Sequence, residues 1–230
     1  MVDIHSHYLP CIDDGSPSAE MSLEMLRIAA QAGVTDVICT PHYRGDYKLP
    51  KNETLKKFRE FEEYAKNAGL PVKLWPGQEV FMGKEGPGNI AEAPYLTLAG
   101  GKYLLAEFDP YSETGVYDAA INIISQGYTP VIAHAERLMR LSYDYIADVH
   151  ALGAMIQVNA ESFAGRHKKF FKDRVAAFFK GGLVDLVASD FHVSREYCMG
   201  KAYKLVEKKC GKDVAEMVFV LNGKKILEGR

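Results

Sequence analysis

The chain has 230 residues, of which 47% are hydrophobic and 25% charged, a composition that excludes disordered and low-complexity classes. Its 28 Lys and Arg residues against 30 Asp and Glu residues leave a formal net charge of -2, which argues against a dedicated nucleic-acid surface. No apolar run reaches the ~18 residues of a membrane span, and the opening MVDIHSHYLP does not have the pattern of a signal peptide. We therefore expect one cytoplasmic domain over residues 1–230, with no membrane insertion and no nucleic-acid partner.

Seven short apolar runs have the Val, Ile and Leu content of buried parallel strands. Segments of helical periodicity lie between them, and several end at a glycine. The predicted strands are 2–7, 35–40, 72–76, 103–108, 130–134, 154–159 and 184–189. The predicted helices are 17–32, 53–68, 115–126, 143–152, 168–180, 195–210 and 213–222. This alternation predicts an α/β protein with parallel strands, and the irregular segment 81–101 is expected to cover one rim.

The four cysteines are spaced too irregularly for a C-x-x-C motif, and a chain of this length does not need disulfide bonds. We interpret Cys11, Cys39, Cys198 and Cys210 as free thiols in a reducing compartment. None is followed six positions later by arginine, so the loop of a cysteine-dependent phosphatase is absent from the sequence. A G-x-x-x-x-G-K-[ST] phosphate loop is absent as well.

Polar side chains stand at the carboxyl ends of the predicted strands, where parallel barrels collect their chemistry. Taken singly, each has an ordinary structural explanation, such as a hydrogen-bonded core histidine or an Asx turn. Their convergence on one end of the strands favours a metal site, because imidazole and carboxylate together suit borderline metals. The candidate ligands are His5, His7, Asp14, His42, Glu79, Glu107, His134, Asp190 and His192.

The local spacing supports this interpretation. In the H-x-H of residues 5–7 the strand period of two puts both imidazoles on one face, and the D-x-H of residues 190–192 repeats the arrangement with a carboxylate. Catalytic metals take about three to four protein ligands each, so this set suggests more than one ion. Without cations, such a cluster would repel and lose hydration. We expect two to three divalent ions of manganese, iron or zinc.

With these motifs the chain resembles the polymerase and histidinol phosphatase (PHP) family, and more closely the metal-dependent tyrosine-protein phosphatases of bacterial capsule and exopolysaccharide operons, the CpsB/CapC type. The resemblance runs in order from the first residues to His192. The matching stretches are DIHSHYLPCIDDGS (3–16), TPHY (40–43), GQEV (77–80), LLAEF (104–108), AHAER (133–137), QVNAESFAG (157–165) and SDFH (189–192). The departures at Cys11, Ala135 and Val193 remove no candidate ligand.

The resemblance implies a distorted, TIM-like (β/α)7 barrel with a trinuclear metal site. It implies that Glu107 bridges metals and that His5, His7 and Asp190 join it around one of them. Neighbouring ions would then be held by two further sets, Asp14, His42 and His192, and Glu79, His134 and the bridging Glu107.

The resemblance also assigns roles in the reaction and a partner. Arg137, Glu107 and Asp190 would be catalytic, and Arg137 and Arg195 would bind substrate. The implied substrate is phosphotyrosine on a bacterial tyrosine autokinase that controls capsule or exopolysaccharide synthesis. Relatives can form homo-oligomers through outer helices such as 17–32.

Three alternatives stay open at this point. One is a PHP-family phosphoesterase that acts on a small phosphate monoester such as histidinol phosphate. Another is a non-catalytic metal-binding interaction protein, which would be expected to lack some of the ligands that are present here. The last is a TIM-barrel amidohydrolase, which usually bridges its metals with a carbamylated lysine on strand four, where this chain has Glu107.

Overall fold

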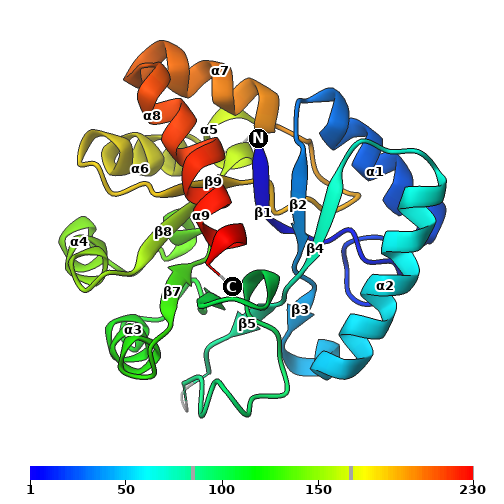
Figure 1. Ribbon diagram of the computed structural model, residues 1–230. Coiled ribbons are helices and arrows are strands. Elements are labelled where there is room, and N and C mark those ends of the chain that lie inside the picture. Colours follow the sequence, from blue (N-terminus) through cyan, green and yellow to red (C-terminus); the bar gives the residue numbers. More distant parts are fainter. Residues whose placement is uncertain (84–85, 166–167, 230) are drawn as a thin grey trace.

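The computed structural model describes residues 1–83, 86–165 and 168–229, and in these residues strands and helices alternate along the chain (Figure 1). The strands are β1 (Val2–Ser6), β2 (Asp36–Cys39), β3 (His42–Tyr43), β4 (Lys73–Pro76), β5 (Glu79–Phe81), β6 (Tyr103–Glu107), β7 (Thr129–Ile132), β8 (Met155–Asn159) and β9 (Leu186–Ala188). The α-helices are α1 (Ala19–Gln31), α2 (Lys51–Asn67), α3 (Val116–Ser125), α4 (Tyr143–Ala151), α5 (Ala160–Ala164), α6 (Lys169–Lys180), α7 (Met199–Cys210), α8 (Lys212–Glu216) and α9 (Asn222–Glu228).

All the strand pairs are parallel, in two sheets of order β1-β2-β4 and β3-β5-β6-β7-β8-β9. The pairing of β2 with β4 continues in that of β3 with β5 at the same register, because Cys39 pairs with Pro76 and His42 with Glu79. A parallel bridge between Ser6 and Phe191 joins the first strand to the segment after β9. The strands thus occupy seven positions around a barrel, and the predicted α/β fold class is confirmed.

The second and third positions of the barrel are broken, which the sequence did not predict. Pro41 separates β2 from β3 and has no N–H to donate to a strand ladder. Gly77 separates β4 from β5, and a Cβ there would lie 2.9 Å from Cγ2 of Ile38, so glycine is needed at this close approach. Two short strands, β3 and β5, result, and they carry His42 and Glu79 at the rim of the barrel.

The C-terminal part of the chain also differs from the expectation. Helix α7 begins at Met199, not at residue 195, since the backbone N–H of Arg195 closes a turn on the carbonyl of His192. The predicted helix 213–222 is split into α8, a π-helical turn at Met217–Leu221, and α9. The irregular segment 81–101 contains a 3-10 turn at Leu98–Gly100, and its residues 84–85 lie outside the described part of the chain.

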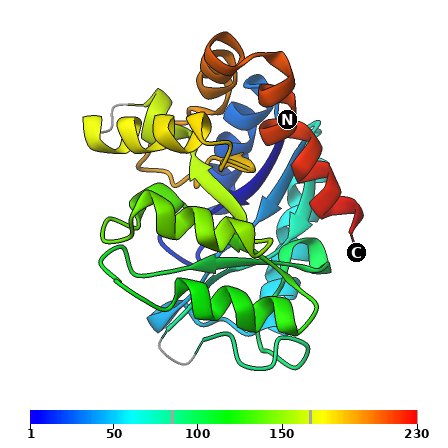
Figure 2. The ribbon, with the colours of Figure 1, turned by 90° about the vertical axis from the view of Figure 1, so that its left-hand side faces the viewer.

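Apolar side chains fill both sides of the barrel wall. One cluster packs α1 and α2 against β2 and β4, and a second packs the helices from α3 to α7 against β5 to β9. Figure 2 shows α3, α4 and α6 on the outer side of the sheet. A third cluster fills the interior and includes Ile226 and Leu227 of α9, which lies across the end of the barrel that faces the viewer in Figure 1. The polar candidate ligands lie at the opposite end of the barrel, where the strands terminate.

No helix among the described residues combines the length and the apolar character needed to cross a bilayer.

Candidate metal centre

Two imidazoles at the end of β1 form the middle of the site. His5 and His7 are fully buried, and their ring centroids lie 5.4 Å apart. Nδ1 of His5 is 3.1 Å from Oε1 of Gln157, an oxygen that also accepts the backbone N–H of His134. Because this oxygen can only accept, His5 must donate through Nδ1, and its Nε2 keeps a lone pair for a cation.

The acidic loop after β1 orients His7. Oδ2 of Asp13 lies 2.7 Å from Nδ1 of His7 and also accepts the backbone N–H of His42. Burial alone would raise the pKa of Asp13, but its attraction to His7 and these hydrogen bonds hold that pKa below its usual range. The carboxylate thus leaves Nε2 of His7 for a metal. A Cβ at Gly15 would lie 2.3 Å from Cβ of His7, so only glycine lets the loop pass this close.

The segment after β9 supplies the opposite wall. Oδ1 of Asp190 is 3.6 Å from Nε2 of His5 and 3.4 Å from Nε2 of His7. Nδ1 of His192 hydrogen-bonds with the carbonyl of Asp190 at 3.0 Å, which turns its Nε2 toward Oδ1 of Asp14 at 3.3 Å. His7 therefore joins two groups of ligand atoms, one with His5 and Asp190 and the other with Asp14, His42 and His192.

Backbone strain coincides with two of the candidate ligands. His134 and Asp190 have φ angles of 34° and 49°, in the left-handed region that residues other than glycine rarely adopt. Such conformations persist only where the surrounding structure holds them, and they collect at functional sites. Each of the two residues comes two positions after the last residue of its strand, β7 or β9, so the turn of the backbone places its side chain at the end of the barrel.

Two arginines converge on Asp190. Nη1 of Arg137, in the turn after His134, lies 3.0 Å from Oδ2 of Asp190, and Nη1 of Arg195 lies 2.6 Å from the same oxygen. Burial would raise the pKa of Asp190, but the attraction of His5 and of both guanidinium groups holds it well below its usual range. The arginine side chains are 23% and 28% exposed, so each can reach both the buried carboxylate and a ligand from solvent.

Glu79 occupies the centre of the imidazoles. Its carboxylate oxygens lie 2.8 Å from His42 and from His134, 3.3 Å from His5 and 3.5 Å from His7. Burial opposes ionisation here, but the attraction of His5 and the hydrogen bonds from the imidazoles hold the pKa of Glu79 well below its usual range. Glu79, on the short strand β5, is thus the carboxylate that touches most of the cluster.

Glu107 stands at the edge of the cluster. Its Oε2 is 3.8 Å from His42, while its Oε1 accepts a hydrogen bond of 2.7 Å from Arg44. Burial, together with the charge of Glu79, raises the pKa of Glu107 to about 8 despite the guanidinium. The family resemblance implies that Glu107 bridges metals, whereas in the structure Glu79 contacts more imidazoles than Glu107 does.

The candidate ligands fall into four groups. Within each group, the ligand atoms lie within 4.8 Å of one another. Glu79 belongs to two of these groups and Glu107 to one. The groups are His7, Asp14, His42 and His192; His5, His7 and Asp190; His5, Glu79 and His134; and His42, Glu79 and Glu107. All nine residues predicted from the sequence are therefore brought together at one end of the barrel.

The chemistry of the site fits divalent cations. Several buried nitrogen and oxygen atoms of the candidate ligands have no hydrogen-bond partner in the described part of the chain, although some lie close to one another. These atoms are His42 Nδ1, Glu79 Oε2, Glu107 Oε2, His134 Nδ1 and His192 Nε2. Buried lone pairs without donors are costly, and cations between them would satisfy several at once. Imidazole nitrogen and carboxylate oxygen are ligands that suit manganese, iron and zinc.

Three residues of the site were not given a role by the sequence. Asp13 and Gln157 lie in the matching stretches 3–16 and 157–165. Their role could have been predicted, because an imidazole that binds a metal through one nitrogen needs a hydrogen-bond partner for the other. Arg44 follows His42 by two positions, so the strand period already places both side chains on one face. Which carboxylate the arginine meets depends on the pairing of β3 with β5 and of β5 with β6, which no local sequence pattern reveals.

Comparison with known proteins agrees with the geometry. A family model described as "Capsular polysaccharide synthesis, CpsB/CapC" matches residues 1–228. The tyrosine-protein phosphatase CpsB of Streptococcus pneumoniae is 32% identical over 238 aligned positions, which cover 99% of this chain and 98% of that protein.

Solved structures give the same result. A crystal structure from work on YwqE of Bacillus subtilis and CpsB of Streptococcus pneumoniae, described as unique metal-dependent tyrosine phosphatases, superposes with a TM-score of 0.94 at 29% identity. It covers 100% of this chain and 95% of that one. The histidinol phosphate phosphatase of Lactococcus lactis superposes with a TM-score of 0.56 at 11% identity, over 95% and 94% of the two chains, and shares the fold.

Proposed function

Since the chain belongs to the CpsB/CapC family, we propose that it is a metal-dependent protein-tyrosine phosphatase without a cysteine nucleophile. The proposal rests on two sets of residues, the candidate metal ligands and a pair of arginines, that lie side by side at one rim of the barrel. Nine imidazoles and carboxylates gather there in groups of metal-binding size, and two half-buried arginines stand directly beside them. Divalent cations held by these ligands, next to guanidinium groups with further N–H donors, would be suited to the charge of a phosphate monoester.

The chain's own residues would bind and orient the phosphate. Arg137 and Arg195 share Oδ2 of Asp190, which fixes the two side chains on one side of the candidate ligands. Each guanidinium has further N–H groups that can donate to phosphoryl oxygens, and planar guanidinium groups suit that geometry. Divalent cations held by the nine candidate ligands would supply charge stabilisation of the phosphoryl group and activation of a water nucleophile. The departing phenolate, with a pKa near ~10, needs little help from a general acid.

For the substrate we infer a phosphotyrosine side chain on a protein, and more finely the tail of a tyrosine autokinase that controls capsule or exopolysaccharide synthesis. The rim supports a protein substrate because it is accessible on the side of the acidic loop and β3. The side chain of Asp14 is 48% exposed and that of Arg44 is 37% exposed. A phosphate on a long aromatic side chain can reach the buried ligands from this side while the peptide backbone stays outside.

Hydrolysis of a phosphotyrosine peptide against histidinol phosphate tests the proposal. Chelator-stripped protein would be assayed after addition of manganese, iron or zinc, with metal content measured in parallel. We expect metal-dependent release of phosphate from the peptide at the higher kcat/KM. A preference for histidinol phosphate would assign the same site to a small metabolite, and inactivity on both substrates with metal bound would contradict the phosphatase proposal.

Loss of a phosphate-binding arginine should leave metal binding intact. We expect Arg137→Ala to lower kcat/KM on a phosphotyrosine peptide by about a hundredfold, which corresponds to one or two charge-assisted hydrogen bonds. Arg195→Ala should cost about tenfold, because Nη1 of Arg195 already donates to both the carbonyl and the carboxylate of Asp190. Metal content by mass spectrometry should match that of the wild type in both variants. Arg140→Ala is the matched control, since Arg140 is exposed and pairs with Glu113 away from the cluster.

The thiols should be dispensable. Cys39 and Cys198 are buried, and burial raises the pKa of the Cys198 thiol to about 11, while Cys11 and Cys210 are exposed. Ellman's reagent should therefore titrate two thiols in the folded protein and four in denaturant. The Cys11→Ser Cys210→Ser variant should keep its metal-dependent activity. A large loss of activity in this variant would mean that a thiol takes part in the reaction.

A further inference from the structure

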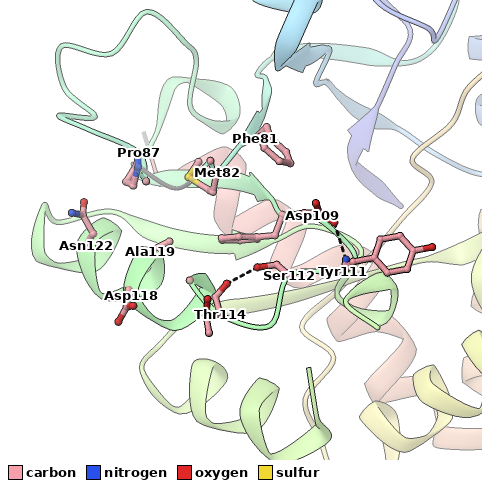
Figure 3. Close-up of a pocket in the computed structure, with 14 residues that line it drawn as sticks. Phe81, Met82, Pro87, Asp109, Tyr111, Ser112, Thr114, Asp118, Ala119 and Asn122 are labelled. Carbon is pink, nitrogen blue, oxygen red and sulfur yellow. Dashed lines mark hydrogen bonds between the residues drawn. The ribbon is translucent and has the colours of Figure 1, made fainter. Parts of the chain in front are cut away.

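A cavity of about 720 Å³ opens beside the candidate metal centre, between the loop after β5 and the start of α3. Figure 3 shows Met82 and Pro87 on one side and Ala119 of α3 on the other, while Ser112, Thr114 and Asp118 lie along the lower side. The metal centre does not use any residue that lines this cavity.

The cavity is continuous with the metal centre through β5 and β6. Phe81, in its lining, lies two residues after Glu79, a separation of about 7 Å along a strand. Phe81 pairs in register with Glu107, and the backbone N–H of Met82 donates to the carbonyl of Glu107 at 2.7 Å. An extended peptide advances about 3.4 Å per residue. Two or three positions along an extended peptide that lies over this rim therefore span about 7–10 Å, which matches the separation between Glu79 and the edge of the cavity.

The lining combines aromatic walls with carboxylates. Phe81, Phe108 and Tyr111 belong to the lining, and Tyr111 is 66% exposed. The carboxylates of Asp109 and Asp118 are in the lining, and no lysine or arginine is among the described residues that form it. Rings and carboxylates together favour a side chain with an apolar stem and a positive end, because the stem packs on the rings and the cation meets both the π faces and the negative charges.

On the basis of the proposed function, we propose that this cavity binds a lysine or arginine side chain of the phosphotyrosine substrate, two or three residues from the phosphotyrosine. The phosphate and the basic side chain then occupy regions of opposite charge on one rim. The arginine pair beside Asp190 receives the first, and Asp109 with Asp118 receives the second. Substrate choice thus depends on the sequence around the tyrosine as well as on the phosphate.

The test uses a set of phosphotyrosine peptides that differ only at one position. A lysine is placed two or three residues before or after the phosphotyrosine, and each peptide is compared with its glutamine and glutamate counterparts. Every kcat/KM is divided by the value for free phosphotyrosine on the same protein. Wild type should favour lysine at the best position by about tenfold over glutamine. Asp109→Asn Asp118→Asn should lose most of this preference, and Asp118→Lys should shift it toward glutamate.

Asp148→Asn is the matched control, because Asp148 is exposed on α4 and does not line the cavity. It should keep the wild-type preference. A preference for lysine that survives in the double variant, or wild-type protein indifferent to lysine at every position, would overturn the inference. Calorimetric binding of the same peptides carrying a non-hydrolysable phosphonate repeats the comparison without turnover. Failure to hydrolyse free phosphotyrosine would thus contradict the proposed function, while the binding data would still decide on the cavity.

Discussion

His5→Ala His7→Ala is expected to lower kcat/KM on a phosphotyrosine peptide by about a thousandfold or more and to reduce the bound metal. The two imidazoles take part in three of the four candidate groups, so their removal weakens most of the cluster at once. Stabilisation of phosphoryl charge by a bound cation is worth several kcal/mol, and a thousandfold corresponds to about 4 kcal/mol. Activity would be measured together with metal content by mass spectrometry.

A histidine outside the cluster provides the control. His150 lies on α4 and pairs with Asp185, so His150→Ala removes an imidazole without touching a candidate ligand. This variant should retain its metal content and its activity within about twofold. If the double variant instead kept the metal content and turnover of the wild type, the assignment of the metal centre to this end of the barrel would be wrong.

Glu79→Gln is expected to have a larger effect than Glu107→Gln on both metal content and turnover. Glu79 touches four imidazoles and belongs to two candidate groups, whereas Glu107 belongs to one and is partly neutralised by Arg44. The amide keeps the size of the side chain but loses the charge that holds a cation. We expect about a thousandfold loss of kcat/KM for Glu79→Gln and a smaller loss for Glu107→Gln.

This pair of variants also decides which carboxylate is shared between ions. Titration of metal-free protein with manganese, followed by calorimetry, should give fewer bound ions for Glu79→Gln than for Glu107→Gln. If Glu107→Gln instead bound fewer ions than Glu79→Gln, the bridging carboxylate would be Glu107, as the family resemblance implies. Each variant is the matched control of the other, because both replace a buried glutamate at the same rim by its amide.

The location of the site could be predicted from the sequence because its ligands stand in local patterns. The two-residue period puts His5 and His7 on one face without any knowledge of the fold. Likewise, apolar runs that end in polar residues predict a polar rim for any parallel barrel. The residues predicted for the rim are the ones that the structure brings together in groups of ligand atoms.

What could not be predicted depends on contacts between distant segments. The interruptions at Pro41 and Gly77 follow from packing across strands, and they decide how His42 and Glu79 enter the cluster. Arg195 fits a helical pattern that runs to residue 210, but its side chain bonds Asp190 and its backbone forms a turn instead. Helical periodicity is a weak signal at helix ends, where tertiary contacts can override it.

The seam of the barrel has a consequence for the order of assembly. His5 and His7, at the end of β1, meet Asp190 where this part of the chain runs beside the segment after β9, with the backbone N–H of Asp190 donating to the carbonyl of His5 and Ser6 bridging Phe191. During synthesis the first strand therefore emerges long before the segment that completes its edge, and it exposes unpaired backbone groups until then. A nascent or truncated chain that stops before β9 cannot assemble this part of the centre, so full metal uptake would report that the whole barrel has closed.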